Sequence, residues 1–144
     1  MPRKELGSFI DRTYKVVRQD LINRFNEAGI DLTPEQWVVL HRLYDDGKMY
    51  QTDLANHSFR DKPTVSRIVD LLTRKELVAR EPDKKDGRKH LVMITSKGKQ
   101  LVKKAYPHVD ASRELGWTNL SESEYSTLVG LLDKIFLNYT EERE

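Results

Sequence analysis

Cationic and hydroxyl side chains gather on one face of a helix predicted in the middle of the chain. The helix is predicted from Asp61 to about Lys75, with Asp61 as its N-cap and Pro63 in the first turn, where a missing N–H costs nothing. The face opposite its apolar stripe is mainly polar and holds Pro63, Thr64, Arg67, Asp70 and Arg74, with Lys62 and Ser66 on its flanks. Arginine pairs with guanine and with phosphate, while short hydroxyls reach phosphates or base edges without filling a groove. These residue types favour contact with the major groove of DNA.

An ordinary solvated surface would carry a similar polar face. The apolar stripe is predicted to be core and consists of Val65, Ile68, Val69 and Leu72. Asp70 fits the solvated interpretation, because it follows Arg67 by three positions and precedes Arg74 by four. We therefore expect Asp70 to orient these two arginines rather than to touch a negatively charged duplex.

A second group of cations lies in a predicted hairpin directly after this helix. Short runs rich in β-branched and apolar residues, 77–81 and 89–95, flank the turn-forming stretch 82–88. The tip is crowded with cations, namely Lys84, Lys85, Arg88 and Lys89. An inserted arginine gains most in a narrow, electronegative minor groove, so Arg88, beside Gly87, is the candidate for insertion. Asp86 either holds this guanidinium in position or is only a turn-forming residue.

The elements before this hairpin complete the order of a winged helix-turn-helix. An amphipathic helix over residues 5–28 ends at Gly29. Thr33-Pro34-Glu35-Gln36 is a capping box that opens a second helix, which Asp46-Gly47 closes. Residues 52–57 then form the short first helix of the helix-turn-helix, and the ribbon after the cationic helix is expected to have two strands.

Two further helices follow the hairpin. Thr95 is expected to cap a helix from Ser96 to about Leu115, bent near residues 103–107 by Pro107. Ser121-x-x-Glu124 is a second capping box that opens the final helix. The first helix and the last two present more apolar surface than one small lobe can bury, which predicts a twofold homodimer with interleaved terminal helices. The alternative is a monomer with a self-sufficient helical core.

Composition and charge narrow the class of protein. The 144-residue chain has no apolar run approaching ~18 residues and no secretory signal, so we expect a cytoplasmic protein without membrane contact. It has no cysteine, which excludes disulfides and thiol redox sensing. Residues 60–104 contain 14 Lys and Arg against 6 Asp and Glu, a net charge of +8, whereas the rest of the chain carries −6. Such clustering is typical of a duplex-binding surface.

Catalysis, a cofactor and a resident metal are not expected. The chain lacks a glycine-rich phosphate loop and a G-x-S-x-G motif, and it has no cysteine nucleophile. Its histidines are scattered and no pair of them has helical i, i+4 spacing, namely His41, His57, His90 and His108. A zinc site built across a dimer stays open as an alternative.

Three stretches together resemble the MarR family of bacterial transcriptional regulators: LTPEQWVVLHRLYDDG, QTDLANHSFRDKPTVSRIVDLLTRKELV and DKKDGRKHLVMITSKGKQL. The resemblance covers nearly the whole chain, 1–144. It implies an α+β, mainly α fold, with a winged helix-turn-helix lobe over 33–95 and a dimerisation lobe over 5–29 and 96–141. It also implies that Thr64, Ser66 and Arg67 lie in the major groove and that Arg88 of the Asp-x-Arg pattern enters the minor groove.

One position departs from the family pattern. Family members commonly have glycine where this chain has Lys75-Glu76-Leu77. A non-glycine residue in the left-handed conformation costs roughly 1 kcal/mol, so we expect the helix to end differently here.

The resemblance further implies that small, often aromatic or phenolic, acids bind where the dimerisation helices meet the DNA-binding lobe. Residues that could supply aromatic walls and a cation are Trp37, His41 and Arg42, with Tyr14 or Arg18 from the first helix. Core packing of Trp37 and pairing of Arg42 with a nearby acid are the simpler interpretations.

The expected function is that of a DNA-binding transcriptional regulator, and repression is the expected sign of regulation. We expect it to bind a pseudopalindromic operator as a homodimer and a small, aromatic acid-like ligand to release it. Recognition helices spaced about 34 Å apart would read such a site. The alternative is a winged-helix protein-interaction module without sequence-specific DNA binding. The cation-rich hairpin argues against that alternative.

Overall fold

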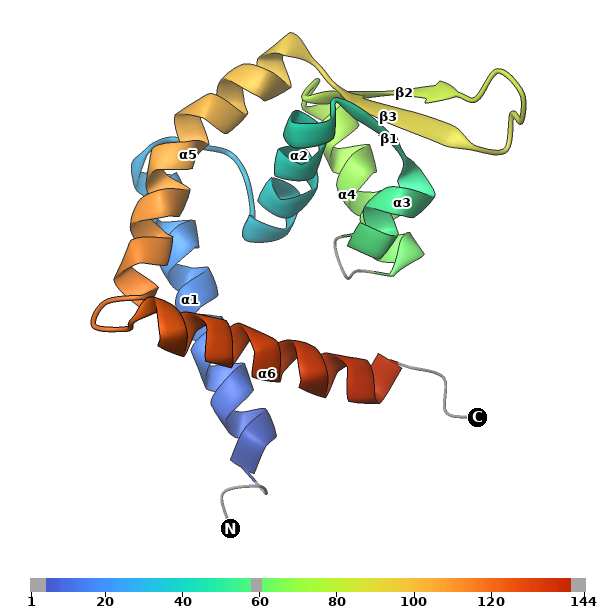
Figure 1. The fold of residues 1–144 in the computed structure, drawn as a ribbon. Helices are drawn as coiled ribbons and strands as arrows, with labels where there is room; N and C mark the ends of the chain where they lie inside the picture. The colour runs from blue at the N-terminus through green and yellow to red at the C-terminus, as the bar shows by residue number, and fades with distance from the viewer. Residues whose placement is uncertain (1–4, 58–60, 141–144) are drawn as a thin grey trace.

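The computed structural model describes residues 5–57 and 61–140 of the chain. Its elements are, in order, α1 (Leu6–Glu27), α2 (Pro34–Asp46), β1 (Lys48–Tyr50), α3 (Gln51–His57), α4 (Lys62–Arg74), β2 (Val78–Pro82), β3 (His90–Ile94), α5 (Ser96–Gly116) and α6 (Glu122–Thr140). Figure 1 shows α2, α3, α4 and the sheet gathered in one lobe, while α1, α5 and α6 extend away from it. The predicted mainly helical winged helix-turn-helix is confirmed.

Local side-chain caps set the starts of the helices. Thr33 Oγ1 accepts a hydrogen bond from the Gln36 amide at 3.1 Å, and the Gln36 side chain accepts from the Thr33 amide at 3.3 Å. Asp61 caps α4 by accepting from the Thr64 amide at 2.7 Å. Thr95 caps α5 by accepting from the Gly98 amide, and Ser121 and Glu124 cap α6 by exchanging side-chain-to-amide hydrogen bonds. Each of these helix starts agrees with the prediction, because a cap and its partner lie within a few residues of each other.

The sheet differs from the prediction. It has three antiparallel strands in the order β1-β3-β2, whereas a two-stranded ribbon was expected. The additional strand, β1, pairs with β3 so that Met49 lies opposite Val92 and Tyr50 lies opposite Leu91. With only three residues between Gly47 and α3, β1 is too short to show the alternation by which strands are recognised. Its pairing with Leu91 places Tyr50 near the turn end of the hairpin.

The end of α4 also corrects the expectation drawn from the missing glycine. Glu76 adopts the left-handed conformation with φ at 63°, so the helix ends in the way that glycine would allow. The Leu77 amide donates to the Leu72 carbonyl and the Glu76 amide to the Thr73 carbonyl, each at 3.0 Å. Lys75 Nζ holds this end of the helix from outside by donating to the Asp31 carbonyl at 2.9 Å. These contacts and the burial of Leu77 outweigh the local strain.

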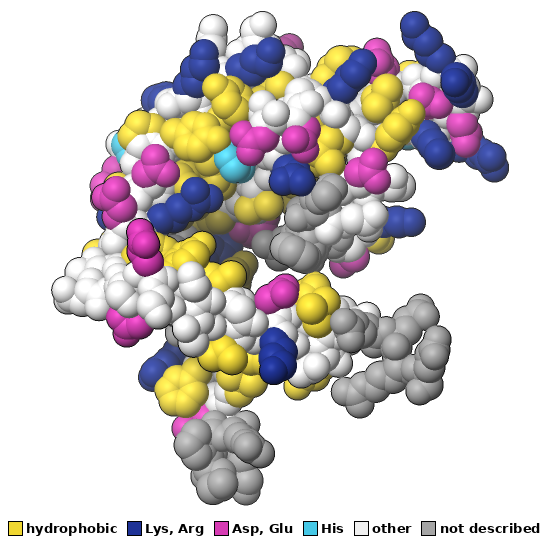
Figure 2. All heavy atoms as spheres, viewed as in Figure 1, with side chains coloured by type: hydrophobic (Ala, Val, Ile, Leu, Met, Phe, Trp, Pro, Cys, Tyr) yellow, Lys and Arg dark blue, Asp and Glu magenta, His cyan; other side chains and the backbone are white. Residues whose placement is uncertain are grey.

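The hydrophobic core lies in the winged helix-turn-helix lobe and at its junction with α1 and α5. The stripe of α4 is buried as predicted, and Phe25 of α1 and Val102 of α5 join the same cluster. By contrast, no residue of α6 is buried in the single chain. Figure 2 shows hydrophobic side chains exposed along the lower helices, which are α1 and α6 in Figure 1. The terminal helices therefore carry apolar faces that this chain leaves uncovered.

Helix α5 passes through Pro107 without interruption. Figure 1 shows its axis changing direction along its length, as expected from the proline. Within residues 5–57 and 61–140, no helix combines the length and the apolar character needed to cross a membrane.

The start of α5 packs closely on the start of β2 at Gly98. A Cβ atom at this position would overlap the Leu77 carbonyl oxygen and would lie 2.7 Å from Ile94 Cγ1. The Thr95 amide also donates to the Leu77 carbonyl at 3.0 Å, which fixes the backbone at this crossing. Glycine is therefore required here for a close approach of two backbones.

We predict that Gly98→Ala lowers the free energy of unfolding by about 1 to 3 kcal/mol, the usual cost of forcing an extra methyl group into a filled space. Thermal unfolding followed by circular dichroism measures the change. Gly87→Ala is the matched control, since a Cβ at Gly87 meets nothing within 4 Å. An unfolding temperature of Gly98→Ala equal to that of the control would contradict the close packing.

Candidate nucleic-acid interface

Helix α4 presents the predicted polar face to solvent. Its buried stripe directs the opposite side outward, where Lys62, Arg67 and Arg74 are exposed and Thr64 and Ser66 are partly exposed. Arg67 Nη2 lies 3.4 Å from the Thr64 hydroxyl, so these two predicted groove-facing groups are neighbours. The first two turns of α4 thus combine hydroxyls and a guanidinium on one accessible surface.

We expected Asp70 to orient Arg67 and Arg74, but it pairs with neither of them. Its carboxylate accepts a hydrogen bond from Nη1 of Arg80, which lies on β2. Arg80 also donates from Nη2 to the Ser66 carbonyl at 3.2 Å and from Nε to Gln51 Oε1 at 3.0 Å. Sequence reasoning missed Arg80, although an arginine in the middle of a strand that packs on α4 was an available signal.

The hairpin of β2 and β3 forms the wing. Two aspartates organise its tip, residues 82–90. Asp83 Oδ2 accepts from the Asp86 amide at 3.0 Å and from the Lys85 amide at 3.3 Å. Asp86 Oδ1 accepts from the Arg88 amide at 3.1 Å and from Arg88 Nε at 3.3 Å. Asp86 therefore both forms the turn and contacts the arginine, as the two interpretations proposed. The Arg88 side chain is 94% exposed and extends from the tip.

Tyr50 joins β1 to the wing and was not predicted. Its hydroxyl donates to Asp83 Oδ1 at 2.9 Å, and Lys89 Nζ lies 5.6 Å from the centre of its ring. The hydrogen bond to Asp83 and the charge of that carboxylate raise the pKa of Tyr50. The same hydrogen bond, with help from the backbone amides, lowers the pKa of Asp83. The tip of the wing is thus tied to β1 by a neutral phenol bonded to a charged carboxylate.

A hollow of about 170 Å³ lies between the start of α3, the start of α4 and the wing. It is lined by Tyr50, Gln51, Thr52, Lys62, Arg88, Lys89 and His90. The hollow brings a predicted cation of the recognition helix, Lys62, together with two from the wing, Arg88 and Lys89. Figure 2 shows Lys and Arg side chains projecting around the far end of the hairpin, where Lys84 and Lys85 lie. Three of the seven predicted DNA-binding cations, Lys62, Arg88 and Lys89, therefore border the hollow.

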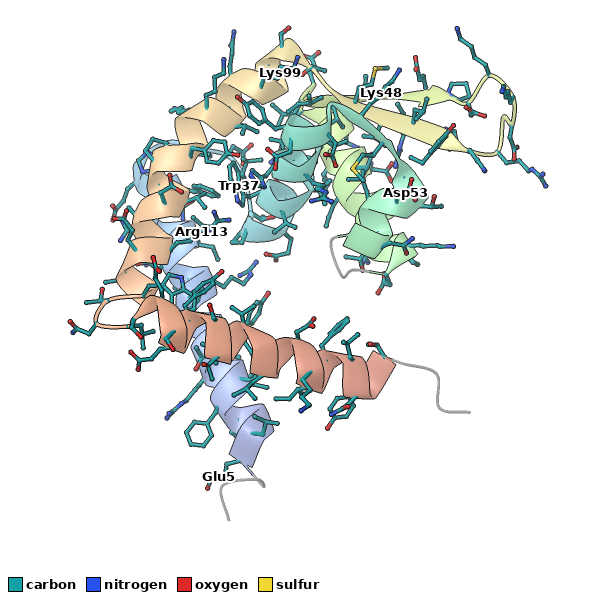
Figure 3. All side chains as sticks on the ribbon, viewed as in Figure 1. Glu5, Trp37, Lys48, Asp53, Lys99 and Arg113 are labelled. Carbon is teal, nitrogen blue, oxygen red and sulfur yellow. The ribbon has the colours of Figure 1, made fainter. Side chains whose placement is uncertain are left out.

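The residues expected to bind a small acid lie at the junction of α1, α2 and α5. Trp37 is only 3% exposed, which confirms that it packs in the core. Figure 3 shows it between α2 and α5. It stacks on His41 with ring centres 5.1 Å apart and meets the edge of Tyr106 at 5.3 Å. Burial raises the pKa of Tyr106, an aromatic residue at this junction that sequence reasoning did not identify.

Both cations predicted for this site have carboxylate partners within the chain. Arg18 of α1 donates to Glu35 of α2, with Nη2 2.6 Å from Oε1 and Nε 3.1 Å from both oxygens. Arg42 Nε lies 3.2 Å from Asp46 Oδ2, as the simpler interpretation held. Tyr14 is exposed on α1. Across the part of the chain that the structure describes, no group of three or more His, Asp or Glu side chains is placed to hold a metal ion.

The chain is similar to transcriptional regulators of the MarR family both in sequence and in structure. Residues 32–90 match the model of the MarR family. The transcriptional repressor NicR of Pseudomonas putida is 30% identical over 132 residues, which cover 92% of this chain and 82% of NicR. The S. aureus MepR–DNA complex superposes with a TM-score of 0.83 at 27% identity, covering 92% of this chain and 97% of MepR. Bordetella bronchiseptica BpsR, whose DNA binding 6-hydroxynicotinic acid regulates, gives 0.82 at 28% identity over 90% and 91% of the two chains.

We predict that Tyr50→Phe raises the pKa of Asp83 toward its ordinary value, because the hydrogen bond that stabilises the charged carboxylate is lost. A group with a depressed folded-state pKa stabilises the fold above its unfolded pKa, and that contribution disappears as the pH falls through the folded pKa. The variant should therefore unfold at a lower temperature than wild type near neutral pH, with the difference shrinking in acid.

Carbon-detected NMR titration of the Asp83 carboxyl measures this pKa, and Tyr139→Phe on α6 is the control because Tyr139 is 84% exposed. An unchanged Asp83 pKa in Tyr50→Phe would show that the hydrogen bond does not hold the wing in solution.

Proposed function

Because the chain belongs to the MarR family, we propose that it is a transcriptional repressor that acts in the bacterial cytoplasm by binding a pseudopalindromic operator as a homodimer. Residues 33–95 form the DNA-binding lobe, and residues 5–29 and 96–141 form the dimerisation lobe, of which residue 141 lies outside the described part. The relatives of named role are transcriptional regulators, and the proposal includes no catalytic step and no cofactor.

One observation supports the proposal most directly: Lys62 of α4 borders the same open hollow as Arg88 and Lys89 of the wing. Helix α4 has the polar, hydroxyl-bearing face that suits a major groove, with Thr64, Ser66 and Arg67 as the base-reading candidates. The wing extends from the same side and carries Arg88 at its tip, where it could reach an adjacent minor groove. The lone acid on this face, Asp70, is engaged by Arg80. A protein-interaction surface would have no need for this arrangement.

The homodimer follows from the terminal helices. Many large apolar side chains on α1 and α6 are at least 40% exposed in the single chain, among them Phe9, Ile10, Val17, Leu128, Leu132 and Phe136. Apolar faces of this extent on two long helices mark an association surface rather than a solvated one. A second copy of the chain would cover them with the same residues, as twofold symmetry requires, and would supply a second recognition helix.

The aromatic junction of α1, α2 and α5 supports an effector site for a small aromatic acid. BpsR responds to such a molecule, 6-hydroxynicotinic acid. In this chain His41 and Tyr106 would form the walls, and a ligand carboxylate would compete with Glu35 for Arg18. Glu35 precedes Gln36, whose side chain accepts a hydrogen bond from Lys75 at the end of α4 at 3.0 Å. Ligand binding at Arg18 would thus act on the turn of α2 that also holds the recognition helix.

Fluorescence anisotropy of wild-type protein with labelled DNA from upstream of its own gene, compared with random duplex across a salt series, tests the DNA-binding proposal. We expect a strong preference for the upstream DNA, two chains per duplex and an affinity that falls steeply with salt as counterions are released. Absence of binding even at low salt would favour the protein-interaction alternative.

We predict that Arg67→Ala weakens binding to the upstream DNA by about 1 to 3 kcal/mol while changing random-duplex binding little, because a base contact is lost. The same titrations measure both affinities. Arg113→Ala on α5 removes an equal charge from the other lobe and is the control. An equal loss on both duplexes would make Arg67 a phosphate contact instead.

We predict that Arg88→Ala reduces the affinity for DNA and also flattens the dependence of log affinity on log salt by about one ion for each arginine removed. Sedimentation velocity should show the dimer unchanged, since the wing lies away from α1 and α6 (Figure 1). Titrations identical to wild type at every salt concentration would remove the wing from the mechanism.

A further inference from the structure

The guanidinium of Arg80 joins the three parts of the DNA-binding lobe. From β2 it bonds to Gln51 on α3 and to Ser66 and Asp70 on α4. We propose that Arg80 is a positioning residue that fixes the wing relative to the recognition helix, and that Asp70 is needed for DNA binding although it is negatively charged. The inference rests on the proposed function and deepens it.

All three nitrogens of the Arg80 guanidinium donate into the protein. Nε reaches Gln51 Oε1 at 3.0 Å, Nη2 reaches the Ser66 carbonyl at 3.2 Å, and Nη1 bonds to the Asp70 carboxylate. The side chain is 25% exposed, whereas that of Arg88 is 94% exposed. A planar group held at three corners permits one relative orientation of its partners. The geometry therefore fits positioning and leaves Arg80 poorly placed to contact a phosphate.

The location of Arg80 explains why its bonds matter for the wing. Arg80 lies opposite Val92 in the middle of the β2–β3 pair, and the strands continue from there to the tip. Arg88 lies in the tip, several residues beyond Arg80. A small rotation of the hairpin about Arg80 would therefore displace Arg88 by a larger distance. Gln51 also lines the hollow that Lys62, Arg88 and Lys89 border. The bond from Arg80 therefore also fixes one of the side chains that line this hollow.

The core rather than this ion pair accounts for folding. The stripe of α4 is buried within the apolar cluster, and an ion pair between partly exposed groups contributes little to the free energy of unfolding. The consequence of losing the pair should therefore fall on the orientation of α4 and the wing. Binding groups that are held in the bound arrangement before association lose less entropy on binding, so a loosened wing lowers the affinity.

Asp70 gives the sharpest test, because electrostatics alone predicts the opposite result. Removing a negative charge from a surface that faces DNA should strengthen binding through weaker repulsion. If Asp70 holds Arg80 in place, Asp70→Asn should instead weaken binding to the upstream DNA, by roughly tenfold for a coupled pair in one network.

The experiment compares wild type, Asp70→Asn, Arg80→Lys and the double variant by anisotropy with upstream and random DNA across a salt series. We expect both single variants to lose roughly tenfold on upstream DNA with the salt dependence unchanged, and the double variant to lose no more than either. Arg80→Lys keeps the charge, so its loss would report the planar bonds. Asp53→Asn removes one acid from α3 (Figure 3) and is the control, expected to bind as well as wild type or better.

Thermal unfolding of each variant should stay close to wild type, and Arg80→Lys serves as the second variant should Asp70→Asn be unstable. Binding by Asp70→Asn and Arg80→Lys as tight as wild type would overturn the positioning role while leaving the proposed function intact. A further variant, Arg80→Gln, removes the charge as well as the planar group. Retained affinity in Arg80→Lys together with a reduced salt slope in Arg80→Gln would show a direct phosphate contact instead and would also overturn the positioning role. Failure of wild type to prefer upstream DNA would remove both proposals.

Discussion

Burial of one side of α4 is the constraint on which the proposed DNA-binding surface depends. Val65, Val69 and Leu72 have no exposed surface in the chain, and fully burying a side chain of this size contributes about 1.5 to 3 kcal/mol. Because the helix is regular, burying this stripe forces Thr64 and Arg67 outward. Turning the helix to bury Arg67 would expose the stripe and place a charge in the core. The chemistry of the exposed face is therefore set by the packing behind it.

The hairpin and the helix form one surface because several contacts converge at their junction. Gly98 lets α5 approach β2, Tyr50 ties β1 to the tip through Asp83, and Arg80 spans the space between β2 and α4. The last two contacts are polar and partly exposed, so they act on orientation more than on folding. Arg18 of α1 links the two lobes by bonding to Glu35 in the first turn of α2. The adjacent Gln36 accepts from Lys75, which joins the same turn to the end of α4.

How much the sequence predicts depends on how far apart the interacting residues lie. The caps at Thr33 and Asp61 and the stripe of α4 depend on neighbours within one or two turns, and all were predictable. Strand β1 was missed because its partner β3 lies more than 40 residues further along the chain. The partner of Asp70 was assigned wrongly because helical spacing favoured Arg67 and Arg74, whereas Arg80 lies on a strand that only the tertiary fold brings against α4. At Glu76, tertiary contacts of Lys75 and Leu77 outweighed the backbone preference, which no local pattern could reveal.

The proposed function requires two copies of α4 and of the wing to engage one duplex together. Hydroxyl-radical footprinting of the DNA upstream of the gene, with wild-type protein near its dissociation constant, tests this most directly. We predict two symmetric protected segments whose centres lie about one helical turn apart, with minor-groove protection at their outer flanks from the wings. A single protected segment, or uniform protection that does not depend on sequence, would contradict the paired arrangement of recognition helices.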